Sequence, residues 1–412
     1  MKYGCIGEKL KHSFSKEIHN ALCDYEYELC EVPSDELSHF MESADFSGIN
    51  VTIPYKERVI PHLSYIDAHA EKIGAVNTVV KRDGRLLGYN TDFSGMCEQI
   101  RHIGFEVAGR KVAILGTGGT SKTAQAVAKF LGARDILVVS RNPEGSEISY
   151  NELYESHADT EVIINTTPLG MYPNNYTKAV ELSRFPSLSG VMDAVYNPLR
   201  TPLIREAMAL GIPAEGGLYM LVAQAVAASE IFLDKKYEKG VCDGVFKKIL
   251  REKENIVLIG MPASGKTTLS RLLAERLSRK SYDTDDMVVE KEGREIKEIF
   301  AKDGERYFRE IEASCVKEVS ASSSAVIATG GGVILNPENL DALRQNGRIY
   351  FIDRPLASLV PTDSRPLSSD RESIEKRYYE RYEKYRAAAD VIIDADCSAE
   401  RVAQKILEDF QN

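Results

Sequence analysis

Short apolar runs of strand length recur along the chain, and segments with apolar residues at helical spacing separate most of them. Because strands that alternate with helices form parallel sheets, this pattern predicts an α/β protein with doubly wound sheets. One exception is a hairpin that we expect to turn at Asp83-Gly84. The runs that we predict to be strands are 3–6, 49–53, 111–115, 135–140, 162–167, 191–196, 256–259, 325–328 and 348–353.

The run NIVLIGMPASGKTT, at 255–268, is the most informative of these units. Its residues 260–267 fit the pattern G-x-x-x-x-G-K-[ST], with a strand before the glycines and leucines at helical spacing after them. In such a loop the backbone N–H groups close on phosphate oxygens, Lys266 reaches the terminal phosphates and Thr267 can bind magnesium. We therefore predict a site for ATP and Mg²⁺ here, formed by Pro262, Ala263, Ser264, Gly265, Lys266, Thr267 and Thr268.

A second glycine turn, GTGG at 116–119, joins the apolar run 111–115 to a helical pattern. It departs from the dinucleotide pattern G-x-G-x-x-G because Ser121 replaces the last glycine. The next strand ends in Ser140-Arg141, where an NAD site would have an acidic residue for the ribose hydroxyls. Arginine suits a 2′-phosphate, so the sequence favours NADPH. The alternative is that Arg141 is an ordinary surface residue.

Several polar residues stand where a strand ends, where a helix begins or inside an apolar helix, and each has two interpretations. Ser13 and Ser15 either cap a helix or bind a ligand oxygen. Lys56, just past the run 49–53, is either a solvated lysine or a functional one. Asp92 stands at a helix start, where aspartate is commonly a cap, and Gln224 is either a satisfied core residue or a ligand contact.

Polar residues also follow the phosphate-binding pattern. Asp283 and Asp285 alternate near the end of a strand, where one can hold magnesium through water and the other can accept a proton from a hydroxyl. The alternative is a polar loop with a capping aspartate. Arg309 can bind a carboxylate through two hydrogen bonds. The glycines at 330–332 permit close approach of a ligand ring to the backbone.

Composition limits the classes of function. The chain of 412 residues predicts two or three domains, and its 43% hydrophobic and 28% charged residues are those of a soluble globular protein. Its net charge of −10 argues against nucleic-acid and membrane binding. The seven scattered cysteines lack metal spacing and indicate reduced thiols, and the N-terminus has no apolar signal segment, so we expect a cytoplasmic protein.

The first 245 or so residues resemble shikimate dehydrogenase. The resemblance implies reduction of 3-dehydroshikimate to shikimate by NADPH, with Lys56 and Asp92 as the catalytic pair. Lys16 replaces the family's usual proline, and Ser140 and Asn142 flank Arg141 where Asn and Thr are common. The motifs that carry it are HSFS, NVTIPYK, VNT, GYNTD, GTGGTS, INTTPLGM, DAVYNPLRTPL and GLYMLVAQ. The implied substrate contacts are Ser13, Ser15, Thr52, Asn77, Asp92, Tyr196 and Gln224. The implied cofactor contacts are Gly116, Thr117, Gly118, Gly119, Thr120, Ser140, Arg141 and Gly217.

From residue 254 to the end the chain resembles shikimate kinase. The resemblance implies phosphorylation of shikimate, with Asp285 as general base, Asp283 and Thr267 at the magnesium, and Arg365 at the nucleotide. It implies that shikimate is bound by Asp285, Arg309, Gly331 and Arg381. The segment 355–364, part of an expected cover over the nucleotide, holds no Arg or Lys, which predicts weaker ATP binding or slower transfer. The motifs are GMPASGKTT, DTD at 283–285, GREIKEIF, GERYFREIE, GGG at 330–332, RPL at 365–367 and the R-x-x-x-Y of 381–385.

Together these patterns predict a bifunctional enzyme in which the product of the first activity is the substrate of the second. We expect a substrate domain at 1–95 completed by helices at 216–248, a Rossmann NADP-binding domain at 96–215 and a P-loop kinase domain like the nucleoside monophosphate kinases at 254–412. Two alternatives are a quinate-type dehydrogenase that uses NAD and a regulatory protein that responds to shikimate. Either a monomer or a homodimer is compatible with the sequence.

Overall fold

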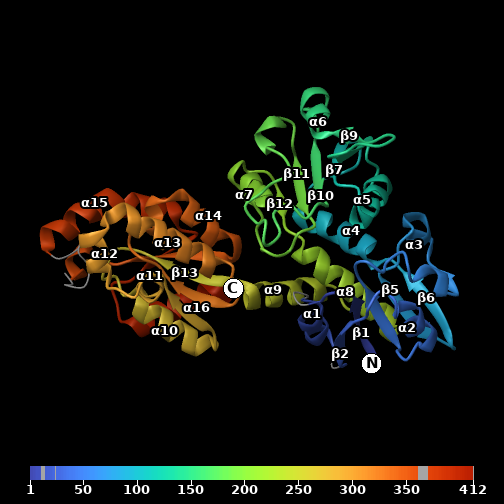
Figure 1. The fold of residues 1–412 in the computed structure, drawn as a ribbon, viewed down its shortest axis with the longest axis horizontal. Coiled ribbons are helices and arrows are strands. Elements are labelled where there is room, and N and C mark those ends of the chain that lie inside the picture. The colour runs from blue at the N-terminus through green and yellow to red at the C-terminus, as the bar shows by residue number, and fades with distance from the viewer. Residues whose placement is uncertain (11–13, 24, 361–369, 412) are drawn as a thin grey trace. The chain divides into compact units, whose positions relative to one another are not determined.

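The computed structural model describes residues 1–10, 14–23, 25–360 and 370–411. It divides into two compact units, Met1–Ile249 and Leu250–Asn412 (Figure 1). Ser13, Arg365 and the part of the expected nucleotide cover at 361–369 lie outside the described residues. Among the residues that are described, no helix is long and apolar enough to cross a membrane.

The first sheet of unit 1 is a mixed, six-stranded sheet in the order β2-β1-β3-β5-β6-β4. Strands β1, β2 and β3 run parallel, whereas β5 pairs antiparallel with both β3 and β6. The tight turn between β5 and β6 is at Asp83-Gly84, where both residues have positive φ. The elements are β1 Tyr3–Gly7, α1 Ser15–Leu22, β2 Tyr27–Glu31, α2 Leu37–Ser43, β3 Gly48–Val51, η1 Ile60–His62, β4 Tyr65–Ile66, α3 Ala68–Ile73, β5 Thr78–Arg82, β6 Arg85–Tyr89 and α4 Thr91–Ile103.

The second sheet of unit 1 is parallel throughout, in the order β12-β11-β10-β7-β8-β9. Residues of β7 alternate between two cores: Val112 and Ile114 face the side covered by α4 and α5, and Ala113 and Leu115 face the other. The elements are β7 Lys111–Leu115, α5 Gly119–Phe130, β8 Asp135–Ser140, β9 Ile148–Ser149, α6 Tyr150–Ser156, β10 Val162–Asn165, η2 Leu182–Arg184, β11 Gly190–Asp193, α7 Pro202–Ala209, β12 Ala214–Glu215, α8 Leu218–Leu233 and α9 Val241–Lys253.

Unit 2 is built on a five-stranded parallel sheet in the order β14-β15-β13-β16-β17. The elements that follow the boundary are β13 Asn255–Ile259, α10 Lys266–Leu277, β14 Lys280–Asp283, α11 Thr284–Glu292, α12 Ile296–Lys302, α13 Gly304–Ser320, β15 Ala325–Ala328, η3 Val333–Leu335, α14 Pro337–Asn346, β16 Gly347–Asp353, η4 Leu356–Ser358, α15 Arg371–Ala388, β17 Val391–Asp394 and α16 Ala399–Gln411.

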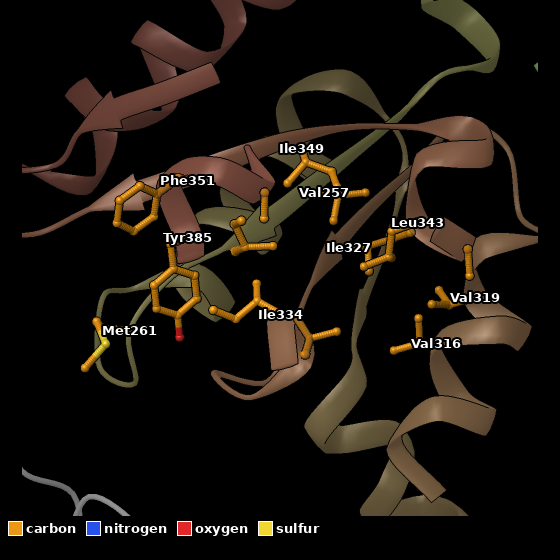
Figure 2. Close-up of a cluster of buried hydrophobic side chains, with 14 of the residues drawn as sticks. Val257, Met261, Val316, Val319, Ile327, Ile334, Leu343, Ile349, Phe351 and Tyr385 are labelled. Atoms are coloured by element: carbon orange, nitrogen blue, oxygen red, sulfur yellow. The ribbon is translucent and has the colours of Figure 1, made fainter. Parts of the chain in front are cut away.

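The core of unit 2 lies on both faces of this sheet. Val257 and Ile259 of β13 pack with side chains from α13, α14 and α15 on one face (Figure 2). Ile256 and Leu258, the alternate residues, pack against α10 and α16 on the other face. Successive side chains of a strand point to opposite faces of the sheet. The sequence of a strand that is buried on both faces is therefore a continuous apolar run. The three sheets therefore confirm the predicted α/β fold class.

Candidate active sites

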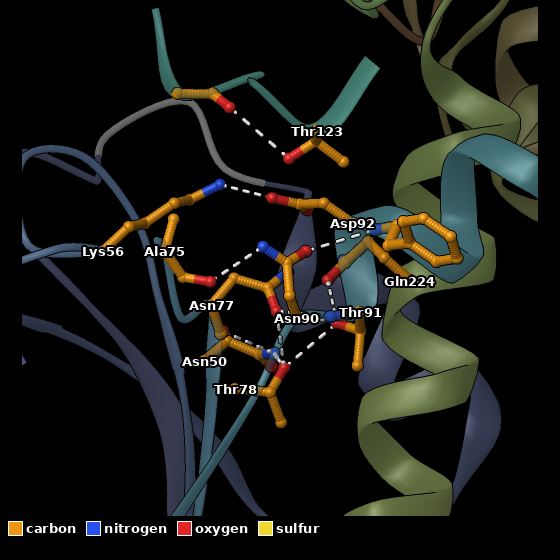
Figure 3. A network of polar contacts seen from close by, with 12 residues as sticks. Asn50, Lys56, Ala75, Asn77, Thr78, Asn90, Thr91, Asp92, Thr123 and Gln224 are labelled. Atoms are coloured by element: carbon orange, nitrogen blue, oxygen red, sulfur yellow. Dashed lines mark hydrogen bonds and ion pairs between the residues drawn. The ribbon is translucent and has the colours of Figure 1, made fainter. Parts of the chain in front are cut away.

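The first candidate site forms where β3 and α4 of unit 1 come together. Lys56 Nζ lies 2.6 Å from Asp92 Oδ2, and their side chains are 23% and 13% exposed (Figure 3). Asp92 does not cap α4, because Asn90 occupies the cap position and its side-chain oxygen accepts a hydrogen bond from Phe93 N at 3.2 Å. Asp92 is therefore not the cap of α4, and its carboxylate pairs with Lys56 instead.

Beside this pair is a buried polar network that contains two further predicted substrate contacts (Figure 3). Asn77 Oδ1 accepts hydrogen bonds from Thr91 N at 2.7 Å and from the Thr78 hydroxyl at 3.1 Å. Gln224, on α8, donates to Leu221 O at 2.8 Å and accepts from the Thr91 hydroxyl at 3.4 Å. In the part of the chain that the structure describes, the amide nitrogen of Asn77 donates no hydrogen bond, which leaves it able to bind a ligand oxygen.

The other predicted substrate contacts of unit 1 come from three separate elements. Ser15 is the buried first residue of α1, and Thr52 follows β3 with its N–H donating to Ile6 O at 2.9 Å. The ring of Tyr196 lies 5.2 Å from that of Phe14, and burial raises the pKa of the Tyr196 hydroxyl. That hydroxyl therefore stays protonated at neutral pH and can donate a hydrogen bond.

The predicted cofactor residues line the turn after β7. Strand β7 lies between β8 and β10, so the strand order reverses at β7. In sheets of this kind, dinucleotides bind where the strand order reverses. Gly116, with φ of +105°, brings the backbone against Thr166, since a Cβ there would lie 3.0 Å from its hydroxyl oxygen. Gly118 and Gly119 are exposed, and no atom lies within 4 Å of a Cβ added to either. The backbone at the start of α5 is therefore open to a ligand.

The remaining residues predicted at this cofactor lie at the same turn, at the end of β8 and at the start of α8. Thr117 and Thr120 flank the glycines, and Arg141 is exposed just beyond β8. Ser140, the last residue of β8, bonds locally with the backbone of Asn142. Gly217 packs tightly instead, because a Cβ there would lie 2.2 Å from Ala194 O.

The phosphate loop of unit 2 joins β13 to α10. Gly265 has φ of +94°, a conformation that L-residues rarely adopt, and it turns the chain into α10. Lys266 is buried and its Nζ donates to Gly260 O at 2.8 Å and Met261 O at 2.9 Å. The Thr267 hydroxyl donates to Asp283 Oδ2 at 2.6 Å, so the two groups predicted to serve magnesium are brought together.

The glycine run 330–332 organises a second cluster of predicted residues. A Cβ on Gly330 would lie 2.5 Å from Asp285 Oδ1, and one on Gly332 would collide with the Arg309 guanidinium. Arg381, which is buried, donates from Nη1 to Gly331 O at 3.0 Å. The predicted residues of this cluster are therefore one carboxylate and two guanidinium groups, which lie against the glycine backbone.

Two residues of this cluster, Glu312 and Tyr385, lie in the quoted motifs but were given no role by the sequence reasoning. Glu312 is 1% exposed, its Oε2 accepts from Arg309 Nη1 at 2.8 Å and its Oε1 has no hydrogen-bond partner among the described residues. Burial raises the pKa of this carboxyl although Arg309 opposes the shift. The Tyr385 hydroxyl donates to Gly331 O at 2.5 Å. The spacing of Arg309 and Glu312, three residues apart on a helix, places them on one face and is the signal that could have found Glu312.

Comparison with known proteins assigns both units. The shikimate dehydrogenase substrate-binding domain matches residues 5–79, and shikimate kinase matches residues 262–411. An NADP-dependent shikimate dehydrogenase of Clostridium perfringens is 37% identical over 265 residues, which cover 60% of this chain and 97% of that protein.

Solved structures show the same likeness. A chorismate mutase/shikimate 5-dehydrogenase fusion protein of Clostridium acetobutylicum is 38% identical with a TM-score of 0.57, covering 60% of this chain and 96% of that one. A Thermus thermophilus shikimate 5-dehydrogenase in complex with NADP(H) and shikimate is 25% identical with a TM-score of 0.55, covering 60% and 99%. The chain belongs to the shikimate dehydrogenase family, carries a shikimate kinase domain behind that part, and is a bifunctional enzyme of the shikimate pathway.

Proposed function

We propose that unit 1 reduces the ketone of 3-dehydroshikimate through Lys56 and Asp92, and that unit 2 phosphorylates a hydroxyl of shikimate with Asp285 as the general base. The observation that carries the first part is the 2.6 Å ion pair between Lys56 and Asp92. Both groups are largely shielded from water, and the pair lies beside the donors and acceptors of the Asn77 network.

In the first reaction NADPH, when bound, supplies the hydride that the ketone carbon accepts. The ketone oxygen then gains negative charge and needs a proton and a nearby cation. Lys56 can supply both, and Asp92 holds the ammonium in place and can accept a hydrogen bond from a ring hydroxyl. Asn77, Gln224, Ser15, Thr52 and Tyr196 offer neutral hydrogen-bonding groups that suit the other ring hydroxyls and the carboxylate.

In the second reaction the substrate hydroxyl attacks the terminal phosphorus of ATP and gives up its proton, while the bond from that phosphorus to ADP breaks and ADP leaves. Asp285 accepts that proton in this proposal, and its carboxylate lies against Gly330 in the same cluster as Arg309. Arg309 and Arg381 provide the charge that a carboxylate ligand requires. Lys266 and the amide groups at the start of α10 suit the phosphates.

The cofactor residues present fit the groups that this chemistry needs. The open backbone at Gly118 and Gly119 leaves the start of α5 accessible to a pyrophosphate, and Arg141 makes no ion pair within the described residues, so it is available for a 2′-phosphate. Magnesium usually keeps several waters and takes one or two protein ligands at nucleotide sites, which the Thr267 and Asp283 pair can provide.

The test uses the purified full chain with 3-dehydroshikimate, NADPH, ATP and Mg²⁺. We expect shikimate when ATP is withheld and shikimate 3-phosphate when it is present, with NADPH preferred over NADH. Lys56→Ala should abolish only the first product and Asp285→Asn only the phosphorylation of added shikimate. Absence of both products from the wild-type chain, or preserved turnover in either variant, would contradict the proposal.

A further inference from the structure

An arginine that no motif includes lies beside the phosphate loop of unit 2. Arg354 directly follows β16, the strand that pairs with β13 and ends at the same edge of the sheet. In the register of these strands Ile259, the last residue of β13, pairs with Phe351. Arg354, three residues after Phe351, therefore lies next to the start of the phosphate loop. A Cβ on Gly265 would lie 3.7 Å from Arg354 Nη1, which places the guanidinium against the loop itself.

Among the described residues, this guanidinium has no ion pair and no hydrogen-bond partner. Within residues 1–10, 14–23, 25–360 and 370–411, Arg354 makes no ion pair, and its Nε is buried without a hydrogen-bond acceptor. The adjacent carboxylate of Asp353 accepts from the Tyr382 hydroxyl at 2.9 Å. A buried donor left unsatisfied destabilises the folded protein, so an arginine in this state is best explained by an acceptor that arrives with a ligand.

The charge balance around the loop points to the same ligand. Segment 355–364 contains no Arg or Lys. Lys266 is the one cationic residue in the phosphate loop at 260–267, and its ammonium group donates hydrogen bonds to the carbonyl oxygens of Gly260 and Met261. A nucleoside triphosphate carries several negative charges on its phosphate groups. The planar guanidinium of an arginine can bind two phosphate oxygens at once, so Arg354 suits such a ligand.

We propose that Arg354 is a further nucleotide-binding residue, whose guanidinium contacts the phosphate groups of ATP and supplies the cation that segment 355–364 lacks. This inference rests on the proposed kinase function of unit 2. With Arg354 in this role we no longer expect weak ATP binding, because the cation missing from segment 355–364 is supplied by Arg354 at the end of β16.

The experiment measures binding of MgATP, MgADP and adenosine to the full chain and to Arg354→Gln by titration calorimetry. A charge-assisted contact predicts that the variant binds MgATP and MgADP about 10- to 100-fold more weakly. Adenosine affinity, the KM for shikimate and the dehydrogenase activity should not change. Arg401→Gln removes an equally charged, exposed side chain from α16 and is the matched control.

Each other outcome has a distinct meaning. Unchanged binding of MgATP by Arg354→Gln would overturn the inference, and an equal loss for adenosine would assign the side chain to the base rather than to the phosphates and would overturn it too. If the wild-type chain failed to phosphorylate shikimate, the proposed kinase function would be refuted, while the titrations would still decide whether Arg354 binds phosphate.

Discussion

In unit 2 the glycine run at 330–332 approaches the phosphate loop at Gly331, and we predict that Gly331→Ala disables the kinase without unfolding unit 2. A Cβ at this position would lie 2.9 Å and 3.0 Å from two ring carbons of Pro262 and 3.3 Å from its nitrogen. The other side of Gly331 is fixed, because its carbonyl accepts from Arg381 at 3.0 Å and from Tyr385 at 2.5 Å. The added methyl group therefore has to separate the glycine run from the phosphate loop.

The size of the effect follows from these distances. Carbon atoms pack at about 3.5–4.0 Å, so the proline ring and the new methyl must move apart by roughly 0.5–1 Å. Pro262 is a rigid ring in the loop backbone and cannot turn aside as a flexible side chain would. Overpacking of this kind costs about 1–3 kcal/mol of unfolding free energy, and a displacement of about 1 Å between reacting groups can lower turnover about 100-fold.

The assay compares Gly331→Ala with wild type in shikimate phosphorylation, in reduction of 3-dehydroshikimate by NADPH with the same preparation, and in urea unfolding. We expect kinase kcat to fall about 100-fold, dehydrogenase rates to stay equal and unit 2 to remain folded. Gly244→Ala is the control, because no atom lies within 4 Å of its added Cβ. Kinase kinetics equal to wild type in Gly331→Ala would show that the loop and the glycine run are not held as the structure has them.

Three further predictions concern unit 1. Lys56→Met should keep the fold and lower reduction of 3-dehydroshikimate by about 100-fold or more, as measured by NADPH oxidation, because the alkoxide loses its proton donor. Arg141→Ser should raise the KM for NADPH about 10- to 100-fold and leave that for NADH unchanged, and equal shifts for both cofactors would contradict a 2′-phosphate contact. Burial raises the pKa of Asp193 from 3.8 to about 6, against hydrogen bonds from Thr201 and neighbouring groups. Since the folded state then holds the proton more tightly, the stability of unit 1 should fall by up to about 3 kcal/mol as pH rises from about 4 to about 6, and urea unfolding of Asp193→Asn should lack this fall.

Local patterns were sufficient to predict the fold and the phosphate loop. The strand, glycine turn and helix at 255–268 are neighbours in the sequence, so their arrangement depends on few distant contacts. The predicted strands β7, β10 and β13 were recognisable because strands buried on both faces contain continuous apolar runs.

The active-site residues were harder to interpret for a physical reason. The sequence around Asp92 allowed either a helix cap or a functional carboxylate. In the structure Asn90 caps α4, and Asp92 pairs with Lys56, which lies 36 residues earlier in the chain. Glu312 was overlooked because Glu305 and Glu310 on the same helix are exposed while Glu312 is not. Burial of one carboxylate among several on a charged helix depends on tertiary packing, which composition does not reveal.

The two units differ in how they divide structural and chemical tasks between side chains. In unit 1, Asn90 starts α4 and Asp92 pairs with Lys56, so a substitution can alter reactivity while the helix start is kept. In unit 2, Asp283 alone accepts from Asp285 N at the start of α11 and from the Thr267 hydroxyl. Selection acting on Asp283 therefore cannot tune the proposed magnesium site and helix stability independently. We expect this position to tolerate less variation over evolutionary time than Asp92 and Asn90 do separately.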